Sequence, residues 1–169
     1  GYLYLDGVAG SYASIPDPIG ALTDFTLQVD GLSPESVRPA ADVTLMCHFG
    51  LINSDRSFLI RVASAGLIYL NLYTTVNESF TTLAVPTDTV GIRITRVGTL
   101  ITYWVDTGSG YVSHGTDTSA GTVLNNAAVP LEIGAFNSGV SSPLTGTISR
   151  AQIWDNGAQT GDPVVDADF

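Results

Sequence analysis

The sequence predicts an all-β fold, an antiparallel sandwich or barrel, on three observations. Short segments in which apolar and polar residues alternate follow one another at short intervals. The 169 residues include 18 glycines and many β-branched residues, a composition typical of strands joined by tight turns. No stretch keeps helical periodicity for longer than about two turns.

The first half of the chain predicts six strands with period-two patterning. A glycine-rich turn separates the first two strands, and a loop containing proline and aspartate precedes the third. After the third strand, Ser33 as cap and Pro34 in the first position predict one short helical turn. The six strands are expected over residues 2–7, 11–16, 25–32, 43–50, 57–64 and 67–74.

The second half predicts a hairpin and four further strands. The hairpin covers 90–106, with its tight turn at Val97-Gly98-Thr99. The other strands are expected over residues 79–85, 111–116, 131–137 and 146–155. Two sheets packed face to face would bury one side of these strands, and we expect the following core: Leu27, Val29, Leu45, Ile60, Val62, Leu70, Leu72, Ile92, Ile94 and Ile153.

Length, charge and cysteine usage restrict the class of protein. At 169 residues, the chain is expected to form a single domain spanning 1–169. Its net charge is -10, and all its basic residues are arginines, so binding to nucleic acid is excluded and binding to an anionic membrane is disfavoured. Cys47 has no partner within the chain, and its apolar surroundings predict a buried, inert thiol. No apolar run is long enough to span a membrane, and we expect this domain to be part of a longer polypeptide.

Several segments resemble laminin-G-like domains, in the same order along the chain. "LYLDGVAGSYASIPD" is similar to the opening of that family, and "LTDFTLQVDGL" to the strand that follows. "RITRVGTLITYWVDTG" resembles the family's hairpin, and "LEIGAFNSGVSSPLTGTISRAQIWD" its closing stretch. The resemblance implies a two-sheet antiparallel jelly roll of the concanavalin-A-like type, with terminal strands close together. The chain departs from the family at Gln28-Val29-Asp30, where an aromatic is usual, and at a longer loop after Asp106.

The chain end resembles a junction in structural proteins of tailed bacteriophages. There, such jelly rolls are followed by a further domain that begins near "ADF", as in "GDPVVDADF". The absence of lysine fits a GC-rich coding sequence. Both features favour a virion protein, on the tail or surface, over an animal matrix protein, with a secreted extracellular protein as the alternative location.

The sequence predicts that the domain is not an enzyme. Glycosidases on this scaffold place carboxylates at alternate positions of one strand, and Glu35, Glu78 and Glu132 have no such spacing. His48 is expected to be a core or rim histidine and His114 a surface one, and no nucleophile motif accompanies either of them.

The candidate ligand-binding residues are aromatic side chains and one amide. Exposed aromatic faces with nearby amides bind sugars, because a pyranose has an apolar C–H face and a ring of hydroxyls. The candidates are Tyr69, Asn71, Tyr73, Trp104 and Tyr111. The alternative is that these rings fill a core or lie under loops, as aromatic residues in strands commonly do.

The two tryptophans pose separate questions of orientation. In the hairpin, Ile101, Tyr103 and Val105 alternate with Trp104, so Trp104 faces outward if they face the core. Its partner is then a covering loop, a neighbouring protein or a sugar, with the first two slightly favoured. Near the end of the chain, either Ile153 or Trp154 must face outward or lie beneath a covering loop.

The candidate metal ligands are aspartates at predicted strand ends. In laminin-G-like domains, Ca²⁺ is often held at the rim by loop carboxylates, and the resemblance implies Asp6, Asp24 and Asp155 as ligands, with Asp106 second in rank. The alternative is that Asp6 and Asp106 only stabilise turns.

These inferences lead to three functional hypotheses. The first is a non-catalytic module of a phage tail or virion surface that contacts host-surface glycans. The second is a structural module that contacts neighbouring virion proteins and has no ligand of its own. The third is a secreted bacterial carbohydrate-binding or adhesion domain. Membrane insertion is not expected in any of them, and homo-oligomerisation is left open.

Overall fold

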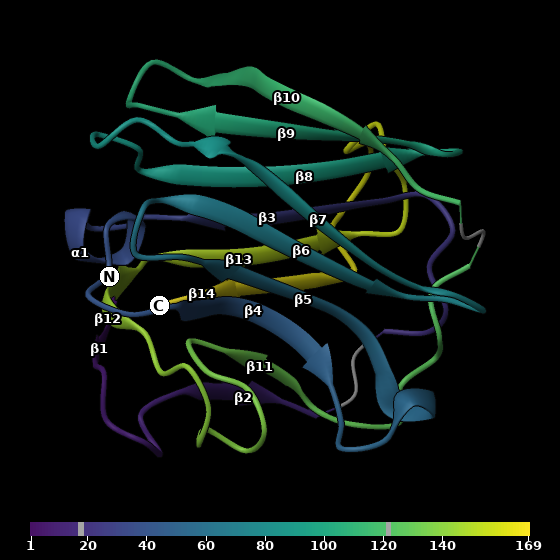
Figure 1. Ribbon diagram of the computed structural model, residues 1–169, viewed down its shortest axis with the longest axis horizontal. Coiled ribbons are helices and arrows are strands. Elements are labelled where there is room, and N and C mark those ends of the chain that lie inside the picture. The colour runs from purple at the N-terminus through teal and green to yellow at the C-terminus, as the bar shows by residue number, and fades with distance from the viewer. Residues whose placement is uncertain (17–18, 121–122) are drawn as a thin grey trace.

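The computed structural model describes residues 1–16, 19–120 and 123–169, and it confirms the predicted all-β antiparallel sandwich. Two six-stranded sheets pack face to face, and a two-stranded ribbon completes the fold (Figure 1). The ribbon pairs β1 (Leu3–Asp6) with β12 (Thr145–Ile148). One helical turn, α1 (Pro34–Val37), and one 3-10 turn, η1 (Asn53–Asp55), lie between strands.

Each sheet brings together strands that are distant in the sequence. Sheet I contains, in spatial order, β10 (Tyr111–Thr118), β9 (Leu100–Asp106), β8 (Gly91–Val97), β3 (Phe25–Asp30), β13 (Arg150–Trp154) and β14 (Val165–Asp168). Sheet II contains β2 (Ala13–Ile15), β11 (Leu131–Ile133), β4 (Val43–Phe49), β5 (Arg56–Val62), β6 (Leu67–Tyr73) and β7 (Asn77–Ala84).

The core lies between the two sheets and follows the predicted alternation. All ten predicted core residues are buried, each no more than 2% exposed. In β6, Ile68, Leu70 and Leu72 are buried, whereas the residues between them are only partly buried. Apolar burial of this extent is the dominant stabilising contribution in a domain of this size.

The chain ends lie side by side, as the resemblance implied. A Cβ on Gly1 would meet the carbonyl oxygen of Phe169, and Figure 1 places both termini at the same side of the molecule. The predicted closing strand does return beside the first strand, but it is divided at Ser149 into β12 and β13. The backbone amide of Ser149 donates to the backbone carbonyl of Asp30 at 2.8 Å, and this bond joins the end of the ribbon to sheet I.

Two further segments differ in detail from the sequence prediction. The chain end, which the sequence suggested was a junction, forms β14 at the edge of sheet I and pairs with β13. Ser33 does precede α1, but its hydroxyl does not cap the helix and instead accepts a hydrogen bond from the amide of Thr147 at 3.2 Å.

The structure can be compared with the predictions for Cys47, for His48 and for membrane-spanning segments. Cys47 is buried, as predicted, and burial raises the pKa of its thiol well above the usual value. His48 is a core histidine whose Nε2 lies 2.8 Å from the carbonyl oxygen of Val129. Among the described residues, no helix is long and apolar enough to cross a membrane.

Candidate functional site

The predicted ligand-binding residues lie on two opposite faces of the molecule. Tyr69, Asn71 and Tyr73 are on the outer face of sheet II, because their neighbours in β6 point into the core. Trp104 and Tyr111 are on the outer face of sheet I. Since the core separates these two groups, the five residues do not form one site.

On sheet II, the predicted aromatic residues pack with other side chains. The rings of Tyr73 and Phe49 meet edge to face with centroids 5.4 Å apart, and the guanidinium of Arg56 lies over both rings. Arg61 lies 5.6 Å from the ring centroid of Tyr69. Asn71 donates its amide to the hydroxyl of Ser79 at 2.5 Å. These rings therefore contact protein groups instead of presenting a shared, open platform.

On sheet I, the strand register aligns outward side chains into rows that cross the sheet. One row, which we call the Trp104 row, consists of Ser113, Trp104, Arg93, Gln28, Gln152 and Asp166. Trp104 is half-buried, and its indole N–H donates to the hydroxyl of Thr95 at 3.0 Å. The prediction that Trp104 faces outward is confirmed, since Ile101, Tyr103 and Val105 are buried in the core.

Tyr111 lies in the row next to the Trp104 row on the same face of sheet I, and its ring covers Gly91. A Cβ at Gly91 would come within 2.6 Å of the Tyr111 hydroxyl oxygen, so the absence of a side chain there makes room for the ring. The hydroxyl donates to the Asp30 carboxylate at 2.5 Å. Burial and this carboxylate raise the pKa of Tyr111, so the phenol remains a hydrogen-bond donor. The guanidinium carbon of Arg93 lies 3.8 Å from the ring centroid.

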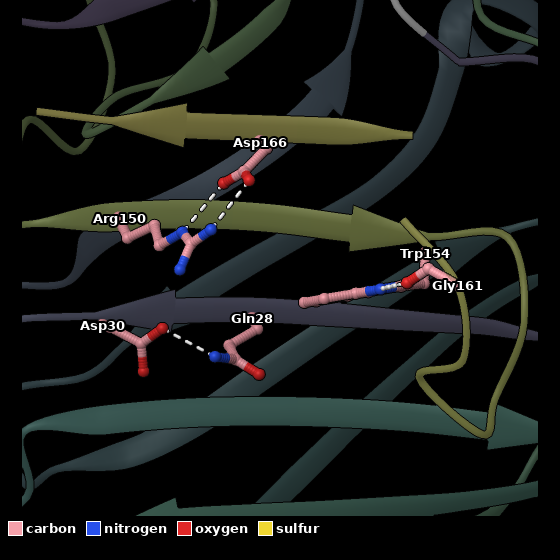
Figure 2. Close-up of polar contacts among 6 residues, drawn as sticks. All are labelled: Gln28, Asp30, Arg150, Trp154, Gly161 and Asp166. Atoms are coloured by element: carbon pink, nitrogen blue, oxygen red, sulfur yellow. Dashed lines mark hydrogen bonds and ion pairs between the residues drawn. The ribbon is translucent and has the colours of Figure 1, made fainter. Parts of the chain in front are cut away.

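Gln28 links these groups into one network. Its amide nitrogen donates to Asp30 at 2.6 Å (Figure 2). Its carbonyl oxygen accepts from Arg93 at 2.9 Å and from Gln159 at 2.8 Å. Gln28 is 7% exposed, so these bonds are screened little by water. Both ends of the amide are used, which holds Arg93 in place beside Trp104.

The loop that joins β13 to β14 covers one end of this face. Trp154 lies beneath it, 6% exposed, and its indole N–H donates to the carbonyl of Gly161 at 3.2 Å (Figure 2). The Thr26 hydroxyl donates to the carbonyl of Asn156 at 3.0 Å, which fixes the loop on the sheet. The loop thus buries Trp154, and Gln159 within it reaches the network at Gln28.

The second arginine of this face is paired with an acid. Arg150 and Asp166 form a two-bond pair, with distances of 2.8 and 2.7 Å (Figure 2). The hydrogen bonds from Arg150 lower the pKa of Asp166. Burial lowers the pKa of Arg93, but nearby acids partly offset this, so Arg93 remains a cation beside Trp104.

Sequence reasoning did not identify several members of this face, among them Gln28, Asp30, Arg93 and Gln159. A signal was present, because two polar residues flank Val29 at Gln28-Val29-Asp30, where the resembled family usually carries an aromatic. The structure places this strand in the interior of sheet I. Gln159 had no such signal, since a long loop places it there.

The structure does not gather the three predicted metal ligands. Asp24 precedes β3 and Asp155 follows β13, so these two lie at the same end of sheet I, whereas Asp6 ends β1 in the ribbon. Asp6 accepts from the amide of Val8 at 3.1 Å, and Asp24 from that of Gly98 at 2.7 Å. Asp106 accepts from two glycine amides in its turn. Among the described residues, no group of three or more His, Cys, Asp or Glu side chains is arranged to hold a metal ion. The three predicted ligands therefore do not lie in one cluster, and calcium binding stays a prediction.

Comparisons with known proteins were made on sequence and on structure. No protein-family model matches the sequence, and no curated protein matches it. Solved structures do match in fold. The CBM40 domain of a Ruminococcus gnavus IT-sialidase, bound to α2,3-sialyllactose, matches with a TM-score of 0.69 and 14% identity, over 93% of this chain and 92% of that chain.

Two more distant examples have the same architecture. Domains LG4-5 of the mouse laminin α1 chain match with a TM-score of 0.62 and 12% identity, over 100% of this chain and 44% of that chain. The enzymatically active domain of tailspike protein 2 from bacteriophage CBA120 matches with a TM-score of 0.53 and 10% identity, over 85% of this chain and 23% of that chain. The chain therefore has the concanavalin-A-like jelly-roll fold, as the sequence resemblance implied.

Proposed function

We propose that the domain is a non-catalytic glycan-binding module, and that the outer face of sheet I around Trp104 is its binding surface. One observation carries the proposal: Trp104 is partly exposed between Arg93 and Ser113 of the same row. An indole face can stack on the apolar C–H face of a pyranose. The guanidinium and the hydroxyl on either side then bind the hydroxyls of the sugar ring.

The arrangement of Arg93 supports this choice. Stacking on Tyr111 and the hydrogen bond to Gln28 fix its guanidinium before any ligand arrives. Ordering side chains on binding costs free energy, so a surface that is already ordered binds weak ligands such as sugars more tightly. The outer face of sheet II gives less support, because Tyr73 and Tyr69 already pack with arginines.

The comparisons support the same function at the level of the fold. The sialidase domain is a carbohydrate-binding module that was solved with sialyllactose, on a fold that matches nearly the whole chain. The tailspike domain, in contrast, is described as enzymatically active. We assign no catalytic role to this chain, because the sequence offers no paired carboxylates with glycosidase spacing.

The biological setting completes the proposal. We place the domain on the tail or surface of a phage virion, where it contacts host-surface glycans. The resemblance of the chain end to phage junctions and the fold of the bacteriophage tailspike support this setting. Two alternatives remain: an assembly module that contacts neighbouring virion proteins, and a secreted bacterial adhesion domain.

The test compares binding by two matched variants. Wild type, Trp104→Ala and Tyr69→Ala are applied to a glycan array, and the best glycan is then titrated by calorimetry. Tyr69 is the control because it is also a half-buried outward aromatic residue, but on sheet II. We expect Trp104→Ala to weaken binding at least tenfold and Tyr69→Ala to leave it unchanged.

Two results would contradict the proposal. Loss of binding in Tyr69→Ala with retention in Trp104→Ala would move the site to sheet II. An array with no glycan bound by wild type would favour the assembly module.

A further inference from the structure

The charges on the outer face of sheet I are placed unevenly around Trp104. The row on one side of the Trp104 row, which we call the Asp30 row, consists of Tyr111, Asp106, Gly91, Asp30, Arg150 and Asp168. The row on the other side carries no charge and consists of Thr116, Thr102, Thr95, Thr26 and Trp154. Trp104 therefore lies between a charged row and a row of hydroxyl groups.

Acids outnumber bases on this face. The Trp104 row and the Asp30 row together hold two arginines and four aspartates, namely Arg93, Arg150, Asp30, Asp106, Asp166 and Asp168. None of the four aspartates is buried, and the whole chain carries a net charge of -10. A ligand that binds at Trp104 thus meets a local excess of negative charge, which a distant charge on the protein does not relieve.

Both arginines are already engaged with other groups of the face. Arg150 forms the two-bond pair with an aspartate described above. Arg93 donates to Gln28. Burial lowers the pKa of Arg93, and nearby charges that include those of Asp30 and Asp106 raise it. An anion that approaches Arg93 therefore also approaches two carboxylates, whose repulsion offsets the attraction of the guanidinium.

The uncharged side of Trp104 offers hydroxyl groups. The indole N–H donates to Thr95 at 3.0 Å, so the ring leans from β9 across β8 toward the row of threonines. Thr102 lies opposite Thr95, and Ser113 lies beside Trp104 on β10. A hydroxyl can both donate and accept, so this side matches the hydroxyls of a sugar ring and offers no cation to a carboxylate or a sulfate.

We infer that the Trp104 surface selects neutral glycans and discriminates against glycans that carry sialic acid, uronic acid or sulfate. The inference rests on the proposed function, because it names the ligand class of the same surface. Like charges at close range make a wrong ligand unfavourable, and salt weakens this repulsion by screening it. In its ligand class, the chain then differs from the Ruminococcus gnavus domain of the same fold, which was solved with sialyllactose.

The test compares matched pairs of oligosaccharides at low and high salt. Each pair is a neutral oligosaccharide and the same molecule with a terminal sialic acid or a sulfate, such as lactose and sialyllactose, and wild type is titrated with both members. We expect the neutral member to bind about fivefold more tightly or better at low salt, and the difference to narrow at high salt.

Two results would contradict this inference, and they can be told apart. Tighter binding of the anionic member would overturn the neutral specificity and leave glycan binding at Trp104 intact. Binding of neither member of any pair would overturn the proposed function and this inference with it.

Two isosteric variants locate the source of the discrimination. Asp106→Asn removes a charge two residues from Trp104 on the same face of β9, and its remaining oxygen can still accept from the glycine amides of the turn. We expect the affinity for the anionic member, relative to the neutral one, to rise about twofold or more at low salt. Asp168→Asn makes the same change of charge on β14, at the far edge of sheet I, and should alter this ratio less. An unchanged ratio in Asp106→Asn would overturn the role of the Asp30 row.

Discussion

The outer faces of the two sheets carry similar residues but use them differently. On sheet I, polar side chains from β3, β8 and β10 join one network centred on Gln28, and Trp104 remains partly uncovered beside it. On sheet II, Phe49 and Tyr73 pack with Arg56, and an acid, Glu132, is buried. Both faces arise from the same period-two pattern. The two faces differ in which segments cover each strand. Alternation along a strand therefore predicts the direction in which a side chain points, but not whether that side chain is exposed to solvent.

The largest expected effect on stability is a difference between the two tryptophans of sheet I when each is replaced by alanine. Trp154→Ala should lower the free energy of unfolding by about 3–5 kcal/mol, because the ring is buried beneath the β13–β14 loop. Trp104→Ala should cost roughly 1 kcal/mol, since a partly exposed ring loses one hydrogen bond. Urea denaturation of both variants measures the difference. Equal losses would mean that Trp104 is as well covered as Trp154.

The Gln28 network can be compared with a single amide contact on sheet II. Gln28→Leu leaves Asp30, Arg93 and Gln159 each without one hydrogen bond, and we expect a loss of about 1–3 kcal/mol. Asn71→Leu removes only the bond to Ser79 and should cost about 0.5–1.5 kcal/mol. Thermal unfolding of the two variants is the measurement. A smaller loss for Gln28→Leu would show that the network is not cooperative.

One acid on each face should give opposite dependences of stability on pH. Burial raises the pKa of Glu132 on sheet II. The contribution of Glu132 to the stability of the fold is therefore complete below the ordinary glutamate pKa of 4.5, and it is lost as pH rises through the folded-state pKa. Arg150 lowers the pKa of Asp166 on sheet I, so its contribution is present above 3.8 and is lost as pH falls through the folded-state pKa.

Two isosteric variants measure these contributions. Relative to wild type, Glu132→Gln should gain stability as pH rises above about 4.5. Asp166→Asn should be less stable than wild type near neutral pH and approach it in acid. Unfolding curves between pH 3 and 8 provide the comparison, and parallel profiles for both variants would contradict the assignment of opposite pKa shifts.

The smallest effect concerns calcium at the end of sheet I. Calcium binding stays a prediction, which Asp24 and Asp155 now carry without Asp6. We expect Ca²⁺ to raise the melting temperature slightly, by mass action on the folded state, and Asp155→Asn to abolish the rise. Melting curves that coincide in calcium and in chelator would remove this prediction.

Much of the fold could be predicted because strand alternation is a local property. The ten core residues, the orientation of Trp104 and the buried thiol of Cys47 follow from period-two patterns and apolar surroundings. The return of the closing stretch beside the first strand was implied by the resemblance. A one-residue slip would exchange the two sides of a strand, and apolar burial penalises that strongly. The sequence therefore determined which way most side chains point.

The candidate site depended on long-range placement. The sequence grouped Tyr69 and Tyr73 with Trp104, but tertiary structure assigned their strands to different sheets. It also brought Gln159 to Gln28 and placed a loop over Trp154. Alternation fixes a side chain relative to its own strand. The packing of residues far apart in the chain decides which strands are neighbours, which loops cover them and where the register shifts. The pattern of a single strand does not predict that packing.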